Sequence, residues 1–278
     1  VKTAAGLLAD DVERITGKHA EIITAERLSE IEATTAVVAG TIGHSRLIDE
    51  MAECGIIDIS SIKGKWESYI VSTVKLPGNE APVLVIAGSD RRGTAYGLIT
   101  ISEAIGVSPW YDWADVPVLE QRNISLAKGT YTAGEPAVKY RGIFLNDEAP
   151  CLTGWVKNTY GTNFGDHRFY ARVFELILRL RGNFMWPAMW GWAFYADDPL
   201  NSKTADDMGI VMSTSHHEPM ARNHQEWTRN GKQYGGVWDY NKNPEGLQKF
   251  FREGIERAKD TEDIITIGMR GDGDAEVA

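Results

Sequence analysis

In the second half of the chain, short apolar runs stop abruptly on polar residues. The clearest example is residues 138–150, where the apolar residues 143–145 are followed at once by Asn146, Asp147 and Glu148. A buried strand that ends in carboxylates is typical of a barrel strand that carries an active-site loop. We therefore expect this stretch to open a domain of a different kind from the one before it.

Residues 1–117 have the pattern of a small α/β support domain. Its β-rich runs lie at residues 20–24, 35–39, 68–74 and 83–87. These runs, with segments of helical spacing between them, predict a mixed sheet with helices. The glycine-rich stretch 88–93 lacks the spacing of a nucleotide-binding loop, so we interpret it as a strand-to-helix turn capped by Ser89 or Asp90.

Two features lead out of this first domain. Arg91 and Arg92 are candidates for contact with a neighbouring domain or with an acidic sugar. Residues 118–137 are predicted to be a linker to the second domain, which spans 138–278.

From residue 138, a strand, a polar end and a helix alternate. The predicted strands are residues 140–145, 183–186, 209–213 and 264–269. Alternating βα units predict a parallel sheet, and polar or aromatic strand ends suit a (β/α)8 TIM barrel better than a doubly wound sheet. The glycine-rich dinucleotide-binding motif that would support a doubly wound sheet is also missing from the sequence. About four units make only the first half of a barrel, so we expect the natural protein to continue past Ala278.

Charged side chains at these predicted strand ends would converge on one face of the barrel. They are Glu148, Glu218, Asp272 and Asp274, with His216, His217 and Arg270. A carboxylate pair between aromatic walls suits glycoside hydrolysis, because one acid protonates the leaving oxygen while the other activates water or attacks. Trp186, Trp190 and Trp192 are candidates for such a wall, although clustered tryptophans also occur in cores and interfaces.

Several of these residues have other interpretations. Asp147 and Glu148 also fit a solvated loop with a helix cap, and Arg270 fits an ion pair at the strand end. His216, His217 and Glu218 include metal-ligand types, but neither HExxH nor HxH spacing is present. Hydrogen bonding of His217 to sugar hydroxyls is favoured, and we predict no metal and no cofactor.

Composition narrows the class of protein further. The formal net charge of -10, without a basic block, excludes a typical nucleic-acid binder, and an anionic substrate would need local cations for its capture. The two cysteines, Cys54 and Cys151, form no metal or redox motif and are predicted to be free thiols. The apolar runs all fall short of the roughly 20 residues that cross a membrane, and no signal peptide is visible.

Long strings along nearly the whole chain resemble the α-glucuronidases of glycoside hydrolase family 115. They are GSDRRGTAYG at 88–97, GVSPWY at 106–111, WADVP at 113–117, YRGIFLNDE at 140–148, NFMWPAMW at 183–190, HHEPM at 216–220 and TIGMRGDGD at 266–274. The resemblance implies removal of glucuronic acid, or its 4-O-methyl ether, from the α-1,2 branches of glucuronoxylan or of xylo-oligosaccharides. It further implies inversion without a metal, an extracellular or periplasmic location and a homodimer of the full-length protein.

The resemblance also carries residue roles onto this sequence. It implies that Asp274 is one catalytic carboxylate and that a second one lies on a later barrel loop beyond this chain. Arg270 and His217 would recognise the uronic acid, and Glu148 would hold sugar hydroxyls or a catalytic water. Residues 275–278 depart from the family pattern.

Asn146, Trp190 and Asp272 complete the predicted substrate-binding set. The chain by itself is then expected to be inactive. Two other classes of function stay open, namely a non-catalytic carbohydrate-binding fragment and a metal-dependent barrel hydrolase that uses His216, His217 and Glu218.

Overall fold

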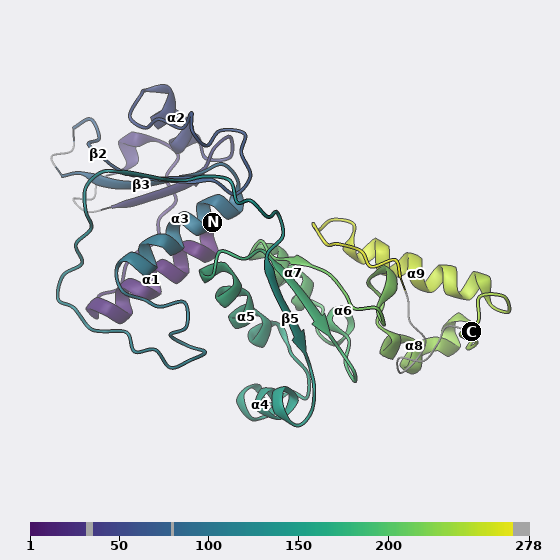
Figure 1. Ribbon diagram of the computed structural model, residues 1–278. Coiled ribbons are helices and arrows are strands. Elements are labelled where there is room, and N and C mark those ends of the chain that lie inside the picture. Colours follow the sequence, from purple (N-terminus) through teal and green to yellow (C-terminus); the bar gives the residue numbers. More distant parts are fainter. Residues whose placement is uncertain (32–35, 79–80, 269–278) are drawn as a thin grey trace. The chain divides into compact units, whose positions relative to one another are not determined.

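The computed structural model describes residues 1–31, 36–78 and 81–268. The chain divides into two compact units (Figure 1). The first unit comprises Val1–Lys139 and Leu178–Arg181, and the second comprises Tyr140–Ile177 and Gly182–Ala278. We describe each unit by itself.

The first unit is built on a four-stranded mixed sheet in the order β1-β3-β2-β4. The strands are β1 (Val37–Thr41), β2 (Tyr69–Val74), β3 (Val83–Gly88) and β4 (Thr130–Ala133). β3 runs parallel to β1 and antiparallel to β2, and β4 pairs antiparallel with β2. The mixed sheet predicted from the sequence is therefore present, although residues 20–24, predicted as β-rich, form no strand. Residues 118–137, predicted as a linker, contribute the sheet's edge strand β4.

Helices cover both faces of this sheet. They are α1 (Lys2–Thr16), α2 (Arg46–Glu53) and α3 (Arg91–Ala104), with a 3₁₀ turn, η1 (Leu28–Glu30). Figure 1 shows α2 on one face and α3 with α1 on the other. Val85 and Ala87 pack with Ile48 and Met51 of α2 in one hydrophobic core. On the opposite face, a Cβ at Gly97 would lie 2.4 Å from Ile86, so only glycine lets α3 approach the sheet so closely.

The turn between β3 and α3 confirms the predicted helix cap. Asp90 is the N-cap residue, and its carboxylate accepts the Gly93 N–H at 2.8 Å. The Arg92 side chain is buried, so the expectation that it reaches an acidic sugar is wrong, whereas its contact with a neighbouring domain stays a prediction. Its buried guanidinium donates to the buried Glu67 carboxylate at 2.7 Å, because a charge taken out of water requires an opposite charge beside it.

The second unit contains a three-stranded parallel sheet in the order β5-β6-β7. The strands are β5 (Gly142–Asn146), β6 (Phe184–Ala188) and β7 (Val211–Met212). A single parallel bridge between Ser213 and Ile264 continues this order toward the fourth predicted strand. That strand, predicted at 264–269, is described only up to residue 268, and beyond the bridge at Ile264 it shows no regular pairing.

The two faces of this parallel sheet differ in burial. Met185 is fully buried at 0% exposure, whereas Phe144, on the other face, is 54% exposed. Phe144 meets Trp186 edge to face with ring centroids 5.2 Å apart. One sheet face is thus packed and the other keeps an open aromatic surface among the described residues.

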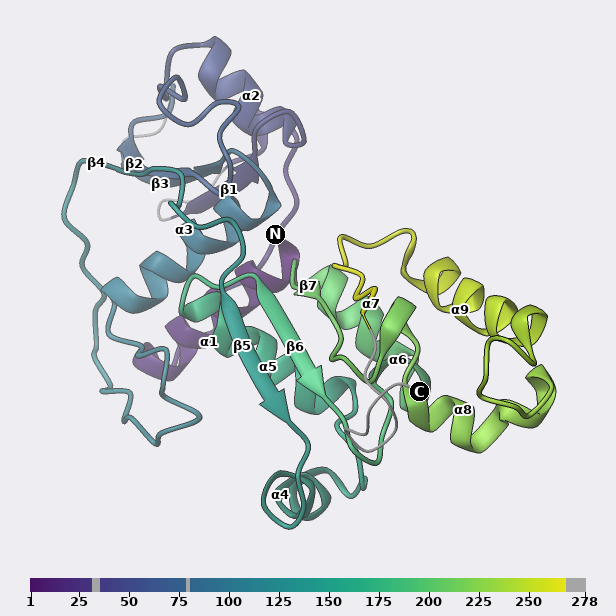
Figure 2. The ribbon, with the colours of Figure 1, turned by 45° about the vertical axis from the view of Figure 1, so that its right-hand side comes forward.

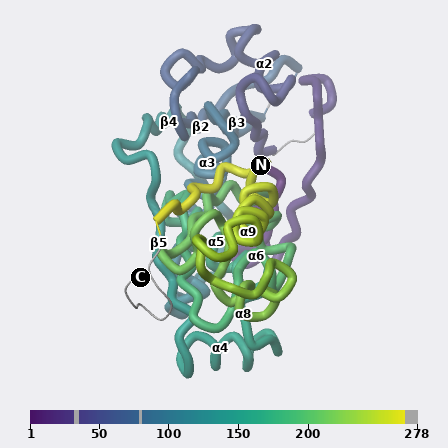
Figure 3. Tube along the Cα trace, turned by 90° about the vertical axis from the view of Figure 1, so that its right-hand side faces the viewer, coloured from purple at the N-terminus to yellow at the C-terminus, as the bar shows by residue number. Residues whose placement is uncertain are grey.

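Helices follow each strand of the second unit (Figure 2). They are α4 (Cys151–Tyr160), α5 (His167–Arg179), α6 (Phe194–Asp197), α7 (Leu200–Asp207), α8 (His224–Asn230) and α9 (Pro244–Ala258), with the 3₁₀ turns η2 (Pro219–Ala221) and η3 (Gly231–Tyr234). Asp166 precedes α5, and its carboxylate caps the helix by accepting the Phe169 N–H at 3.2 Å. Helices α8 and α9 (Figure 3) enclose an aromatic core that contains Trp227, Tyr234 and Phe250.

Two further predictions concern the whole described chain. Cys54 and Cys151 are both free and exposed, as expected. Among the described helices, we find none with the length and apolar character needed to cross a membrane.

Candidate active site

The carboxyl ends of β5, β6 and β7 lie at one edge of the parallel sheet. The ladder continues past β5, where the Asp147 N–H donates to the Ala188 carbonyl at 3.1 Å. It also continues past β7, where the Ser213 N–H donates to the Met185 carbonyl at 3.0 Å. Because parallel strands point the same way, the loops that follow them emerge together.

The loop after β5 carries two predicted substrate-binding residues. Asn146 ends the strand, and its side-chain amide donates to the Glu148 carboxylate at 3.2 Å. Glu148 is exposed, so its carboxylate remains available to a ligand. Between them, the Asp147 carboxylate accepts the Trp190 N–H of the next loop at 2.9 Å.

The loops after β6 and β7 meet through aromatic rings. The Trp190 indole, 50% exposed, lies beside the His217 imidazole with ring centroids 5.7 Å apart. The His216 and His217 rings lie 4.2 Å apart between centroids and are tilted by 50°. An exposed indole beside an imidazole offers an apolar surface and polar nitrogen atoms to the same ligand.

Glu218 differs from the prediction that placed it with the open carboxylates. Its side chain is buried, at 1% exposure for the residue, because the loop after β7 folds inward. Its carboxylate accepts the Ser215 N–H at 3.2 Å, the Ser215 hydroxyl at 3.0 Å and the Asn223 amide at 2.7 Å. Burial raises the pKa of Glu218 to about 7, against the lowering effect of these donors.

This arrangement does not support a metal site at His216, His217 and Glu218. Both carboxylate oxygens of Glu218 accept hydrogen bonds from neutral donors of the protein. Among the residues that the structure describes, no group of three or more His, Cys, Asp or Glu side chains is arranged to hold a metal ion.

Burial also shifts the acidity of groups behind the strand ends. It raises the pKa of Asp147, and the neighbouring Glu148 charge adds to this effect. The pKa of Asp263 is raised by burial too, although Asp263 accepts the Tyr195 hydroxyl at 2.6 Å. The site therefore rests on carboxyls that hold their protons more tightly than carboxyls in water do.

Of the predicted site residues, four lie on the described strand-end loops: Asn146, Glu148, Trp190 and His217. The other three, Arg270, Asp272 and Asp274, lie outside the described residues. The start of their segment does pack beside β7, since the Thr266 hydroxyl donates to the Thr214 carbonyl at 2.5 Å.

Sequence reasoning missed the supporting residues of this region. Asn223 caps α8 in a capping box with Glu226, and this pair has the recognisable spacing of an N-cap with an acid three residues later. Asp147 and Gln225 contact the backbone of Trp190 from elsewhere in the chain. The spacing of residues along the sequence does not predict such contacts.

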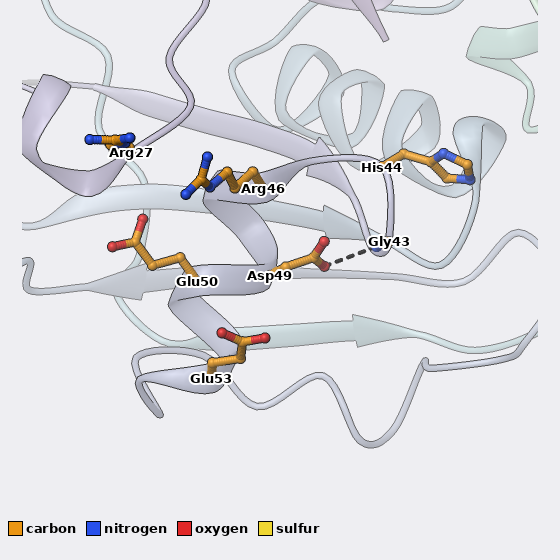
Figure 4. Close-up of a pocket in the computed structure, with 7 residues that line it drawn as sticks. All are labelled: Arg27, Gly43, His44, Arg46, Asp49, Glu50 and Glu53. Carbon is orange, nitrogen blue, oxygen red and sulfur yellow. Dashed lines mark hydrogen bonds between the residues drawn. The ribbon is translucent and has the colours of Figure 1, made fainter.

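A hollow of about 680 Å³ lies in the first unit, beside α2 (Figure 4). It is lined by Arg27, Gly43, His44, Arg46, Asp49, Glu50 and Glu53. Asp49 accepts the Gly43 N–H at 2.9 Å, so part of its charge supports the loop after β1. The walls mix both signs of charge at an open surface, and the predicted site residues lie elsewhere.

The family model of glycosyl hydrolase family 115 matches residues 133–278, which is more than half of the chain. The chain belongs to this family, as the resemblance of its sequence strings indicated. It is a glycosidase homologue of mixed α/β structure.

A solved structure similar to the chain is that of a family 115 4-O-methyl-α-glucuronidase with specificity for decorated arabinogalactans. The two share 36% sequence identity with a TM-score of 0.84. The match covers 99% of this chain and 34% of the other, so the chain spans about a third of that relative's length. No curated protein matches the chain.

Proposed function

We propose that the protein is part of an α-glucuronidase that removes glucuronic acid, or its 4-O-methyl ether, from α-1,2 side chains of glucuronoxylan. The observation that carries this proposal is the shared edge of β5, β6 and β7. There, Asn146 and Glu148 follow one strand and the Trp190 and His217 rings meet across two others. Family membership and the glucuronidase activity of the similar structure support the reaction class.

The proposed architecture is a small N-terminal α/β domain, residues 1–117, and the first half of a (β/α)8 barrel, 138–278. The connecting segment, 118–137, adds the edge strand β4 to the sheet of the first domain. Three observations support the half barrel. The three strands are parallel and follow chain order, their helices intervene, and the aromatic face at Phe144 is open. In a closed barrel such a face points inward and is covered by the remaining strands.

In the proposed mechanism, the reaction inverts the anomeric centre through two carboxyls. Asp274 is one of them, and its partner comes from a barrel loop outside this chain. An inverting pair stands roughly 6.5–9.5 Å apart, with room for the attacking water. Arg270 binds the uronic carboxylate in a bidentate ion pair, and His217 donates to the sugar.

Three residues complete the proposed substrate site, together with Asp272. Glu148 holds sugar hydroxyls or the attacking water, and Asn146 orients Glu148 through their hydrogen bond. Trp190 offers its half-exposed indole to a pyranose face. The chain alone is proposed to be inactive, since it lacks the second carboxyl.

The test is Asp274→Ala in the full-length enzyme, assayed for uronic acid release from glucuronoxylan. Loss of a catalytic carboxyl should lower kcat/KM by several orders of magnitude, on the order of 10⁴-fold. Asp207→Ala is the matched control, because Asp207 lies on the exposed face of α7, paired with Lys203. Near-normal turnover by the Asp274 variant contradicts the assignment.

A substrate panel separates the alternatives. Release of uronic acid from decorated arabinogalactan but not from glucuronoxylan would move the proposal to the substrate of the similar structure. Because polymeric substrates stay outside cells, we also propose an extracellular or periplasmic location, and a homodimer of the full-length enzyme. Cell fractionation and light scattering test these two points.

A further inference from the structure

We propose that Asp147 is a positioning residue that holds the loop after β6 and thereby fixes the Trp190 indole for the substrate. This inference rests on the proposed function, which assigns Trp190 to the substrate site. Asp147 itself acts through Trp190, because its carboxylate accepts the Trp190 N–H of the neighbouring loop.

The backbone of Trp190 is held from both sides by side chains. Its N–H donates to the Asp147 carboxylate at 2.9 Å, and its carbonyl accepts the Gln225 side-chain amide at 2.8 Å. These two residues come from different elements, the loop after β5 and helix α8. Fixing one residue at both of its peptide groups leaves little freedom in its φ and ψ angles.

The residues that follow are held in the same way. The Gly191 carbonyl accepts from Arg229 at 2.9 Å, and the Ala193 N–H donates to the Asp197 carboxylate at 2.6 Å. Arg229 and Asp197 also form an ion pair. This loop has no strand or helix of its own, so side chains supply the hydrogen bonds that a ladder supplies elsewhere.

A held backbone under a half-exposed indole is the arrangement of a preorganised platform. A ligand that stacks on a ring already fixed in place does not have to order the loop, so more of the contact appears as affinity. The Trp190 ring also lies beside His217, at 5.7 Å between centroids, so displacing the indole would disturb the imidazole.

The setting of Asp147 distinguishes it from an ordinary loop carboxylate. One oxygen is used for Trp190, whereas the other is buried without a hydrogen-bond partner among the described residues. Asp147 also borders a small apolar hollow lined by rings that include Phe169, Tyr170 and Trp192. A buried carboxyl in apolar surroundings is costly, and such costs concentrate at positions that serve a site.

The experiment measures KM and kcat of the full-length enzyme on a xylo-oligosaccharide carrying 4-O-methylglucuronic acid. The variants are Asp147→Ala, Asp147→Asn, Trp190→Ala, the double variant Asp147→Ala/Trp190→Ala, and the exposed control Asp207→Ala. We expect Asp147→Ala to raise KM about tenfold, the size of one aromatic contact, with a smaller change in kcat. Asp147→Asn keeps an oxygen acceptor and should retain a KM close to that of the wild type.

The double variant decides between positioning and general support of the fold. If Asp147 acts through Trp190, the double variant has the KM of Trp190→Ala alone. If the effects of the two substitutions on KM multiply in the double variant, the positioning role is wrong. It is also wrong if Asp147→Ala lowers the melting temperature and leaves KM unchanged. Should Asp147→Ala fail to fold, Gln225→Ala removes the other restraint on Trp190, and an unchanged KM there also overturns it.

The same experiment distinguishes this inference from the proposed function. If the wild-type enzyme releases no uronic acid from any substrate, the proposed function fails and this inference falls with it. If the wild type is active, and Trp190→Ala raises KM while Asp147→Ala does not, the positioning role alone is wrong.

Discussion

Each unit of the protein buries a carboxylate near a strand end, and the two carboxylates have different kinds of partner. In the first unit, Glu67 accepts from the Arg92 guanidinium at 2.7 Å, with side-chain exposures of 0% and 3%. In the second unit, Glu218 accepts from the hydroxyl and N–H of Ser215 and from the Asn223 amide. Among the described residues, those neutral groups are the whole set of hydrogen-bond donors to Glu218.

The difference teaches what a buried carboxylate is used for. The Arg92 guanidinium balances the charge of Glu67, and the Trp66 ring lies 4.7 Å from Arg92. This cluster therefore stabilises the turn before α3. Neutral donors offset only part of the cost of burying the Glu218 carboxylate, and the pKa of Glu218 rises to about 7. The first cluster is structural, whereas the second changes charge near neutral pH.

The largest expected effect comes from breaking the first pair. Arg92→Ala removes the guanidinium that balances the buried Glu67 carboxylate, which should lower the free energy of unfolding by about 3–5 kcal/mol. Urea unfolding measures this change. Lys203→Ala, which breaks the exposed pair with Asp207, should cost at most about 0.5 kcal/mol. Similar losses of unfolding free energy in both variants would show that the buried Arg92–Glu67 pair does not stabilise the first unit more than an exposed pair does.

The second effect is a pH dependence that belongs to Glu218. Its folded pKa of about 7 lies above its ordinary value of 4.5, so the folded state binds the proton more tightly than the unfolded state. The resulting stabilisation is fully present below pH 4.5 and is lost as pH rises through 7, by about 3 kcal/mol in all.

Glu218→Gln isolates this contribution, because glutamine does not titrate. Between pH 4.5 and pH 8, the wild type should lose on the order of 3 kcal/mol more unfolding free energy than the variant loses. Urea unfolding at both pH values measures the difference. Parallel losses in the two proteins would show that Glu218 does not carry the pH dependence.

The smallest effect compares the two helix caps beside these carboxylates. Asp90→Ala removes the cap of α3 and should cost about 1 kcal/mol at pH 6 and at pH 8 alike. Asn223→Ala removes the cap of α8 together with a donor to Glu218, and that donor favours the ionised form. Its cost should therefore be larger at pH 8 than at pH 6. Equal costs at the two pH values would separate Asn223 from the titration of Glu218.

The sequence predicted what depends on neighbouring residues along the chain. The cap at Asp90 and the strand that ends at Asn146 follow from local spacing, and both are present. The burial of Arg92 was missed because its partner Glu67 lies 25 positions earlier, in a loop where Glu67 adopts a left-handed φ of 49°. Pairing across such a distance depends on how the elements pack, which periodicity does not describe.

The candidate site was predictable to a similar extent. Trp190 and His217 were predicted to share one site, and their rings do meet. Glu218 was placed with them because it follows His217 directly, but the irregular backbone after β7 sends consecutive side chains in different directions. The short edge strand β4 was missed because three of its four residues are exposed and give no apolar signal.

The open aromatic face at Phe144 has a consequence for how the protein is made. Under the proposed barrel, a ribosome delivers β5 and β6 well before the strands that would cover Phe144 and Trp186. During that interval the nascent chain displays apolar rings to the cytosol or to the export machinery. Under the proposed barrel, the order of synthesis therefore favours chaperone binding to this half until the later strands are made.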